Sequence, residues 1–230
     1  MQATQTVKKG YKGFPMEGMV ARWYAKIRGT SSQVEEWRRQ AVELTGDLPS
    51  GASILEIAPG PGYFAIEMAR LGRFHVTGLD ISRTFVEIAR ANAQRAGVSV
   101  DFQLGDASNL PFKGELFDLI ISQAAFKNFS RPREVINEMY RVLRFGGTAV
   151  IEDMNRSSTG ADIDHEVRSM RLGALNAFMT RRTLGSLQRR AYAPEQFERM
   201  ASASAFGGCR VETSGIGLQV RLKKPDQDNL

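Results

Sequence analysis

Short apolar stretches alternate with helix-like stretches along most of this chain, from residue 51 onward. The apolar stretches are typical of buried strands, and the segments between them place apolar residues on one side of a helix. This alternation predicts a parallel sheet that is joined by right-handed crossovers and covered by helices on both faces. The strands predicted in this part are 53–58, 74–80, 98–104, 117–123 and 147–153.

The last part of the chain predicts a different strand arrangement. Two short apolar segments, 209–214 and 216–222, flank a tight turn at Gly215. A hairpin of this kind can add an antiparallel strand to the edge of a parallel sheet. The predicted fold class is therefore α/β, with a Rossmann-like seven-stranded sheet that is mostly parallel, an antiparallel C-terminal hairpin strand, and helices on both faces. The tail from Lys223 is expected to be loose.

Two regions lie outside this alternation. Residues 1–50 contain no strong strand and are expected to form an N-terminal helical leader, or cap, that packs onto a main domain of 51–230. Within the main domain, an insertion at about 155–203 begins with a polar loop and predicts a long helix over about 163–187, followed by another helix. Arginines and apolar residues share faces of this insertion, which makes it a candidate lid over a substrate. Its basic face could select an anionic substrate or lie against a membrane; solvated arginines are the other interpretation.

Composition limits the classes of protein that fit. The chain has 230 residues, of which 42% are hydrophobic and 24% charged, so it predicts one soluble domain. It contains no apolar run of the ~18 residues needed to cross a bilayer and no signal-peptide pattern, so we expect a cytoplasmic protein. Cys209 is the single cysteine, which excludes an internal disulfide and a cysteine-based zinc site, and no metal site is expected. The net charge of +6 suits an anionic partner, but also an ordinary solvated surface.

The strongest functional signal is an apolar run that ends in a paired-glycine turn. Residues 54–62 read Ile-Leu-Glu-Ile-Ala-Pro-Gly-Pro-Gly, and Asp80 ends the next predicted strand. Glycines let the main chain approach a ligand closely, and an acid at the end of the second strand can hold a ribose. The pattern predicts a nucleoside-cofactor site, although glycines also serve simply to reverse a chain. A nicotinamide dehydrogenase would use the same features, but its fingerprint needs a third glycine where this chain has Ala65.

Further motifs follow the glycine turn in a fixed order. They are Asp80-Ile81-Ser82, Gly105-Asp106-Ala107, Leu110-Pro111-Phe112, Phe117-Asp118-Leu119-Ile120 and Val142-Leu143-Arg144-Phe145-Gly146-Gly147. Over about residues 50–153 this series resembles the class I S-adenosylmethionine-dependent methyltransferases, in particular the small-molecule branch that includes the ubiquinone and menaquinone biosynthesis methyltransferases. The resemblance implies S-adenosyl-L-methionine as the cofactor, S-adenosyl-L-homocysteine as its product and a small molecule as the methyl acceptor.

The resemblance also implies which residues bind the cofactor. Glu56 would lie beneath the glycine turn, and Asp80 would hold the ribose hydroxyls, because one carboxylate oxygen can accept from each of them. Ile81 would pack on the adenine and Asp106 would accept from its amino group, although a core residue and a strand end are the plain structural interpretations of these two. The remaining implied contacts are Ala58, Gly60 and Gly62 with the amino acid part, Ala107 through its backbone, and Gln123 at the floor of the site.

Candidate contacts with the acceptor are fewer. Lys127 and Asn128 follow the fourth predicted strand, where relatives commonly have a histidine pair that faces the acceptor; a solvated lysine is the alternative. Tyr24 would close the pocket from the leader, or else pack the leader helix. His165, in the insertion, is a candidate base or metal ligand, whereas a polar residue on a surface helix is the simpler interpretation.

The implied reaction is an in-line displacement at the methyl group, which needs alignment and exclusion of water rather than a metal. We expect acceptor oxygen or carbon ahead of nitrogen or sulfur, and an anionic or aromatic substrate. An RNA or other nucleic-acid methyltransferase is disfavoured, because residues 122–125 read Ser-Gln-Ala-Ala where such enzymes usually carry Asn or Asp, two prolines and an aromatic. A protein that binds the cofactor without transferring its methyl group stays open, and the sequence indicates no oligomeric state.

Overall fold

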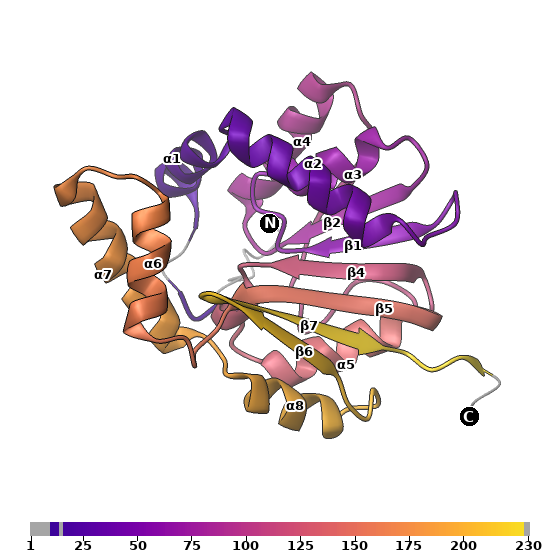
Figure 1. Cartoon of the computed structure of the whole chain (residues 1–230). Coiled ribbons are helices and arrows are strands. Elements are labelled where there is room, and N and C mark those ends of the chain that lie inside the picture. The colour runs from indigo at the N-terminus through magenta and orange to yellow at the C-terminus, as the bar shows by residue number, and fades with distance from the viewer. Residues whose placement is uncertain (1–9, 14–15, 228–230) are drawn as a thin grey trace, which may run out of the picture.

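The computed structural model describes residues 10–13 and 16–227 and contains one mixed sheet (Figure 1). Its strands are β1 (Ser53–Ile57), β2 (His75–Asp80), β3 (Asp101–Leu104), β4 (Phe117–Gln123), β5 (Leu143–Met154), β6 (Arg210–Ser214) and β7 (Gly217–Lys223). They are hydrogen-bonded in the order β3-β2-β1-β4-β5-β7-β6.

The directions of the strands confirm the predicted fold class. β1 to β5 are parallel to one another, with Ile54 opposite Val76 on one side and Leu119 on the other. β7 is antiparallel to both β5 and β6, so it is the one strand that runs against the rest. Gly215, in the turn between β6 and β7, has a φ of 52°, the left-handed conformation that favours glycine.

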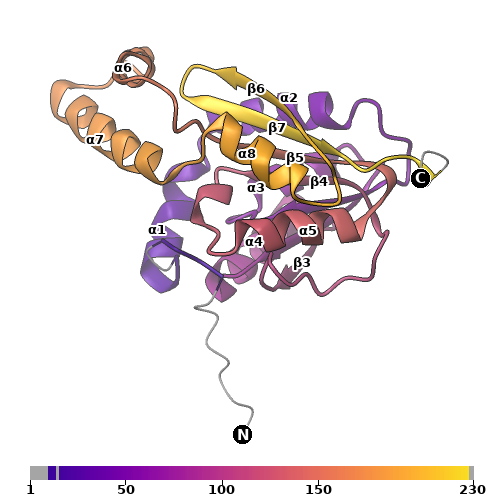
Figure 2. The same cartoon turned by 90° about the horizontal axis from the view of Figure 1, so that it is seen from below.

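Helices cover both faces of the sheet (Figure 2). They are α1 (Gly18–Arg28), α2 (Ser31–Thr45), α3 (Tyr63–Arg70), α4 (Arg83–Ala96), α5 (Pro132–Val142), α6 (Gly160–Ser169), α7 (Ala174–Arg190) and α8 (Pro194–Ser202), with a short 3₁₀ helix, η2, at Phe126–Asn128. One core forms where α2, α3 and α4 pack on the sheet, and a second where α5 and α8 pack on its opposite face. In α4, Ser82 caps the amino end by accepting from the Phe85 amide, and Gly97 ends the helix in a left-handed conformation.

The central strands are held by burial on both faces, which is why they read as unbroken apolar runs. Ile54, Leu55 and Ile57 of β1 have no exposed surface at all. Burying each such side chain contributes about 1.5–3 kcal/mol. The carboxyl ends of these strands are therefore fixed positions, and the loops that follow them start from a rigid edge.

Three predicted boundaries are wrong. The single long helix expected over about 163–187 is two helices, α6 and α7, because Arg171 adopts a left-handed conformation with φ 50° and Gly173 opens the second helix. β5 begins at Leu143 rather than at residue 147, and its pairing with β4 shifts register between Phe117 and Leu119. β3 begins at Asp101, three residues later than expected.

The expectation of a loose tail from Lys223 is also wrong for the described part. Lys224 is 3% exposed, and its Nζ donates to the Leu143 carbonyl oxygen at 2.9 Å. The same ammonium lies 4.7 Å from the ring centre of Tyr140 and 4.6 Å from that of Phe145. Cation–π contacts and backbone acceptors thus hold the chain just after β7.

Within the described ranges, no helix combines the length and the apolar character that crossing a bilayer requires.

Candidate functional site

The glycine turn joins β1 to α3 with unusual backbone geometry. Ala58, Gly60 and Gly62 all have positive φ, at 60°, 55° and 78°. A Cβ on Gly62 would lie 2.6 Å from the Phe102 ring, whereas a Cβ on Gly60 would meet nothing within 4 Å. Gly62 is therefore required by packing, and Gly60 leaves open space where a ligand can approach the main chain.

A second alanine repeats this strain on the neighbouring strand. Ala124 follows β4 with a φ of 53°, and its amide donates to the Glu152 carbonyl oxygen at 2.7 Å. Ala58 is held in the same way, by donating to the Leu79 carbonyl oxygen at 2.8 Å. A non-glycine residue in this region costs about 1–2 kcal/mol, and such residues cluster at functional sites. Both strained positions lie at the carboxyl ends of adjacent strands, where ligands bind in open α/β sheets.

Asp80 ties the end of β2 to the glycine turn. Its Oδ2 accepts from the Gly60 amide at 2.9 Å, and its Oδ1 accepts from the Ser82 amide at 2.8 Å. Burial raises the pKa of Asp80 to about 6, against the lowering effect of these two amide hydrogen bonds. Near neutral pH the carboxylate is ionised, and each oxygen keeps a free lone pair for a ligand hydroxyl.

Glu56 lies in β1, just before the turn, and it is almost wholly buried. Its Oε2 has no hydrogen-bond partner among the described residues. Burial raises the pKa of Glu56 to about 8; a hydrogen bond from the Ala65 backbone opposes this, and the nearby charge of Asp80 adds to it. An unpartnered buried carboxyl is costly, so this position is ready to receive a donor or a cation.

Asp106 is held by its own loop rather than left free. Its Oδ1 accepts from both the amide and the hydroxyl of Ser108, at 2.9 and 2.6 Å, and its Oδ2 pairs with Arg131 at 2.9 Å. Burial raises the pKa of Asp106, but these hydrogen bonds outweigh it and leave the pKa below its usual value. The carboxylate is thus ionised and oriented, and 27% of the side chain stays exposed.

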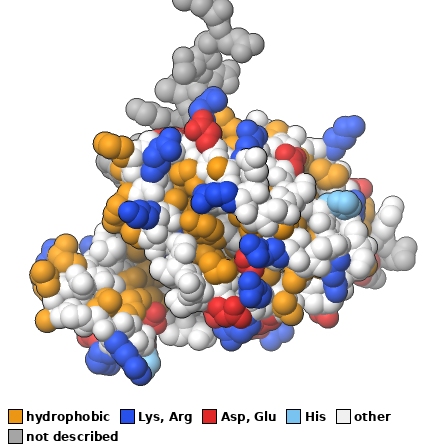
Figure 3. Space-filling model, turned by 90° about the horizontal axis from the view of Figure 1, so that it is seen from above, with side chains coloured by type: hydrophobic (Ala, Val, Ile, Leu, Met, Phe, Trp, Pro, Cys, Tyr) orange, Lys and Arg blue, Asp and Glu red, His pale blue; other side chains and the backbone are white. Residues whose placement is uncertain are grey.

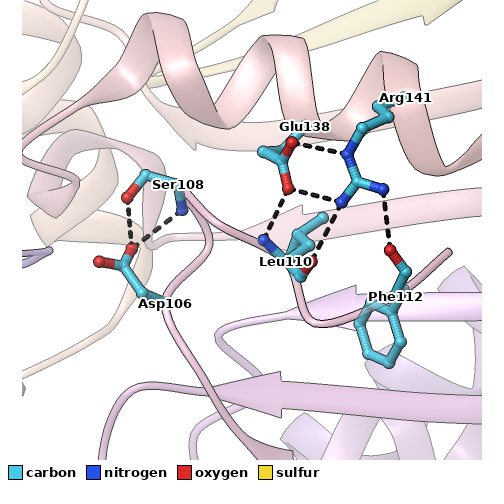
Figure 4. Close-up of polar contacts among 6 residues, drawn as sticks. All are labelled: Asp106, Ser108, Leu110, Phe112, Glu138 and Arg141. Atoms are coloured by element: carbon cyan, nitrogen blue, oxygen red, sulfur yellow. Dashed lines mark hydrogen bonds and ion pairs between the residues drawn. The ribbon is translucent and has the colours of Figure 1, made fainter. Parts of the chain in front are cut away.

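The loop that carries Asp106 is anchored to α5 (Figure 4). Arg141 makes two hydrogen bonds to Glu138, both at 2.7 Å, and donates to the carbonyl oxygens of Leu110 at 3.0 Å and Phe112 at 2.8 Å. Glu138 accepts in turn from the Leu110 amide at 2.7 Å. Hydrogen bonding to Arg141 is the main reason that the pKa of Glu138 is lowered. This bidentate pair fixes the loop that follows β3.

The other implied cofactor contacts lie at the same edge of the sheet. Ala107 is buried and Ile81 is half-buried directly after β2. Gln123 ends β4 and donates to Glu152 at 2.8 Å and to Gln40 of α2 at 3.3 Å. The residues proposed for the cofactor therefore converge on the carboxyl ends of β1 to β4.

Lys127 is buried, so the alternative of a solvated lysine does not describe it. Its Nζ forms an ion pair with Asp153 at 2.7 Å and also donates to the Ala124 carbonyl oxygen. Asp153 accepts in addition from the amides of Lys127 at 2.8 Å and Met154 at 2.7 Å. The ion pair with Asp153 occupies the Lys127 ammonium and holds η2 against β5. The proposed role of Lys127 toward an acceptor stays a prediction.

Asn128, next to this pair, keeps unused hydrogen-bonding capacity. Its Oδ1 is buried and has no partner within the described part of the chain. Its backbone oxygen accepts from the Lys12 amide at 2.7 Å, and Tyr11 forms an isolated bridge with Phe129. The described residues 10–13 thus lie along the loop that follows β4.

This N-terminal segment, 10–13, is a part of the site that the sequence reasoning missed. A Cβ on Gly10 would lie 2.7 Å from the carboxylate of Asp106. Lys12 Nζ donates to the hydroxyl of Tyr192 at 3.0 Å, and so links the start of the chain to the segment after α7. The one local signal is a tyrosine and a lysine enclosed by Gly10 and Gly13.

Electrostatic effects place Tyr11 among groups from three elements. Burial raises the pKa of Tyr11, the charge of Arg190 at the end of α7 lowers it, and Asp80 and Tyr24 raise it. Tyr24, on α1, packs edge-to-face on Phe85 with ring centres 5.9 Å apart. The leader and the insertion therefore both reach the carboxyl edge of the sheet.

His165 lies apart from this convergence. It is exposed on α6, where its charge contributes to lowering the pKa of Asp162. Across the described ranges, His, Cys, Asp and Glu side chains form no group of three or more that suits a metal ion. The proposed role of His165 as a base stays a prediction.

Comparison with known proteins gives one family match and many relatives. A family model described as a methyltransferase domain matches residues 55–151. The ubiquinone/menaquinone biosynthesis C-methyltransferase UbiE of Desulfotalea psychrophila is 37% identical over 125 residues, which are 54% of this chain and 50% of that protein. The chain spans about half the length of the curated relatives that it matches first.

Solved structures match over most of the chain. A protein from Methanococcus maripaludis, assigned as an S-adenosyl-L-methionine-dependent methyltransferase, superposes with a TM-score of 0.73 at 19% identity, covering 95% of this chain and 98% of its own. The plantazolicin methyltransferase BpumL, crystallised with a desmethylPZN analogue and SAH, has a TM-score of 0.65 at 16% identity and 89% coverage of both chains. These structures share the fold described above.

Proposed function

We propose that this chain, whose residues 55–151 match a methyltransferase domain, transfers the methyl group of S-adenosylmethionine to a small organic acceptor. The observation that carries the proposal is the meeting of the open glycine turn, Asp80 and the unpartnered Glu56 at one edge of the sheet. This edge is where open α/β sheets bind ligands.

The residues present fit this cofactor. The buried Oε2 of Glu56 needs a donor, and the α-ammonium of a methionine supplies both a donor and a positive charge. The ionised carboxylate of Asp80 suits the ribose diol, and the oriented carboxylate of Asp106 suits an exocyclic amino group. Gly60 and the uncapped amino end of α3 offer main chain to the amino acid part.

When bound, S-adenosylmethionine supplies an electrophilic methyl group on a sulfonium. The task of the chain is to align an acceptor with that group and to exclude water. We propose that the leader, residues 1–50, and the insertion at about 155–203 form the cap that does so. Tyr24 and Arg190, which both act on Tyr11, support this arrangement.

We propose that the acceptor is an electron-rich, acidic ring. Tyr192, on the acceptor side, is backed by the buried ring of Phe126, with ring centres 5.7 Å apart. Lys12, above Tyr192, can stabilise an oxyanion, so a strong base is not needed. The Oδ1 of Asn128 is buried and has no partner among the described residues, and we propose that it accepts from the acceptor's hydroxyl when the acceptor binds. We propose a phenol or hydroquinone that is methylated on carbon or oxygen, in a cytoplasmic setting.

The test is an assay of the purified chain with methyl-labelled S-adenosylmethionine against phenols, hydroquinones, amines, thiols and a structured RNA. We expect label to enter a phenolic or hydroquinone acceptor. Label in RNA alone would contradict the choice of a small-molecule acceptor. Calorimetry with S-adenosylhomocysteine separates the two parts of the proposal, because tight binding without any transfer would keep the cofactor and reject the reaction.

A further inference from the structure

α1 exposes an apolar stripe that nothing in the described structure covers. Met19, Trp23 and Ile27 are spaced four residues apart and are 87%, 62% and 46% exposed. The opposite side of the helix is anchored, because Ala21 and Ala25 are buried. Large apolar side chains in such a row are not needed for folding, and contiguous apolar surface of this kind marks an interaction site.

α7 has the same character to a greater degree. None of its residues is buried, although Leu175, Phe178 and Met179 lie on one side of it, with exposures of 74%, 56% and 56%. The turn before it adds Met170 and Leu172. A helix that buries no apolar residue in its own protein gains little from the fold, so its apolar side needs another explanation.

The two helices lie at the same end of the molecule. Figures 1 and 2 both place α1 and the α6–α7 pair beyond the carboxyl ends of β1, β2 and β4. Their residues Tyr24 and Arg190 both perturb the pKa of Tyr11. The exposed apolar rows therefore flank the candidate site.

The charged residues of these two helices are all basic. α1 contains Arg22, Lys26 and Arg28, and α7 contains Arg181, Arg182, Arg189 and Arg190, while neither helix contains an acidic residue. Arg181 pairs with Asp164 of α6, and Arg182 lies over the Phe178 ring. Figure 3 shows hydrophobic and basic side chains side by side on the protruding α6–α7 part.

We propose that α1 and α7 together bind the surface of an anionic lipid membrane, with their apolar residues inserted at the headgroup level and their cations on the lipid phosphates. Helices with Trp, Phe and Leu on one side and Lys or Arg on the other are suited to this interface. A second copy of the chain is a poorer occupant, because the same cations would face one another. The inference goes beyond methyl transfer and does not depend on the acceptor.

The main experiment is co-sedimentation of the full chain with two kinds of vesicle, phosphatidylcholine alone and phosphatidylcholine mixed with phosphatidylglycerol. We expect binding to the anionic vesicles and weaker binding, by about tenfold or more, to the neutral ones. Replacing Trp23→Ala and Phe178→Ala should weaken anionic binding by about tenfold each. Arg22→Gln and Arg182→Gln should each weaken it by about fivefold.

Matched controls lie elsewhere on the surface. Val42→Ala removes an apolar side chain of α2 that is 54% exposed, and Arg133→Gln removes an exposed cation of α5. Both variants should bind vesicles like the unaltered chain. S-adenosylhomocysteine calorimetry on every variant shows whether the fold and the candidate cofactor site are intact, so loss of docking is distinguishable from loss of the proposed function.

Fluorescence gives an independent measurement, because Trp23 and Trp37 are the only tryptophans. In the Trp37→Phe variant, emission from Trp23 should shift to the blue when anionic vesicles are added, whereas the Trp23→Phe variant should show no shift. Vesicle binding that survives both Trp23→Ala and Phe178→Ala would overturn the proposal. So would absence of vesicle binding together with concentration-dependent dimerisation, which would assign the apolar rows to a second copy.

Discussion

The cofactor side and the acceptor side of the site differ in what holds them. On the cofactor side, buried strands end in backbone positions that neighbouring amides fix, as with Asp80 between Gly60 and Ser82. On the acceptor side, Lys12, Asn128 and Tyr192 come from three distant segments and meet through single contacts. The methyl donor can be held by geometry that tolerates little change. The segments that meet the methyl acceptor can vary without disturbing the sheet.

The largest expected effect is on stability, at the junction of the two sides. Lys127→Met removes one member of a buried ion pair and should lower the free energy of unfolding by about 3–5 kcal/mol. Denaturant unfolding measures this loss, and the double variant with Asp153→Asn should recover part of it. Unchanged stability with loss of methyl transfer would instead give Lys127 a direct role in the reaction.

The glycine turn should separate packing from ligand approach. Gly62→Ala should destabilise the chain by about 2–4 kcal/mol, because it adds a clash with Phe102 to an unfavourable φ. Gly60→Ala and the remote control Gly72→Ala meet no neighbour, so each should cost only about 1–2 kcal/mol. Of the variants Gly60→Ala and Gly72→Ala, calorimetry should find weakened S-adenosylhomocysteine binding only for Gly60→Ala. Equal binding by both would remove Gly60 from the cofactor site.

Asp80→Asn should weaken S-adenosylhomocysteine binding by about 100-fold, or ~2.7 kcal/mol, because a charged acceptor for the ribose becomes neutral. The pKa of Asp80 is about 6, so affinity of the unaltered chain should fall as the pH drops below 6. This pH dependence should vanish in the variant. A titration of affinity that is flat between pH 5 and 8 in both proteins would contradict the assignment.

Glu56 gives a test through protons. Its pKa is raised to about 8 in the folded chain from an ordinary value of 4.5, so folding takes up a proton and stability falls as the pH rises from about 4.5 to 8. Glu56→Gln should remove this contribution, which comparison of Tm against pH will show. If the cofactor ammonium binds beside Glu56, the pKa of Glu56 drops and the carboxyl loses its proton. Calorimetry near pH 7 in buffers of different ionisation enthalpy should detect this proton release. No release would place the ammonium elsewhere.

The smallest effect should come from the acceptor side. If the Tyr11 hydroxyl donates to the acceptor, Tyr11→Phe should raise the KM for the acceptor by about fivefold, through the loss of that hydrogen bond, and leave the Kd of S-adenosylhomocysteine unchanged. Tyr140→Phe is the control, since its ring packs on Lys224 away from the site. A change in cofactor affinity equal to the change in KM would move Tyr11 to the cofactor side.

The sequence alone predicts the cofactor side better than the acceptor side. The succession of strands along the chain and the edge that carries Glu56, Gly60 and Asp80 were predictable, because buried runs and turn glycines act locally. The contact between Lys12 and Tyr192 joins residues 180 positions apart, and no local pattern announces it. The break at Arg171 was equally hidden, since an arginine at positive φ carries no turn signal.

Long-range contacts also decide what a lysine does. In the sequence, Lys127 is a candidate contact with the acceptor or a solvated lysine, and Lys224 falls in a tail that is expected to be loose. In the structure each is buried by partners that come from another strand or helix. Burial of an ammonium depends on acceptors brought together by the fold. The role of a single basic residue therefore depends on distant partners more than on the local sequence around it.

The buried contacts of Lys224 have a practical consequence. It fixes the chain just after β7, a strand that ends at the opposite edge of the sheet from α1 and α7 (Figure 1). A biotinylated peptide appended on the C-terminal side of Lys224 would hold the molecule on a sensor chip with α1 and α7 turned toward the flowing sample. Immobilised in this orientation, the chain keeps its candidate site accessible for measurement.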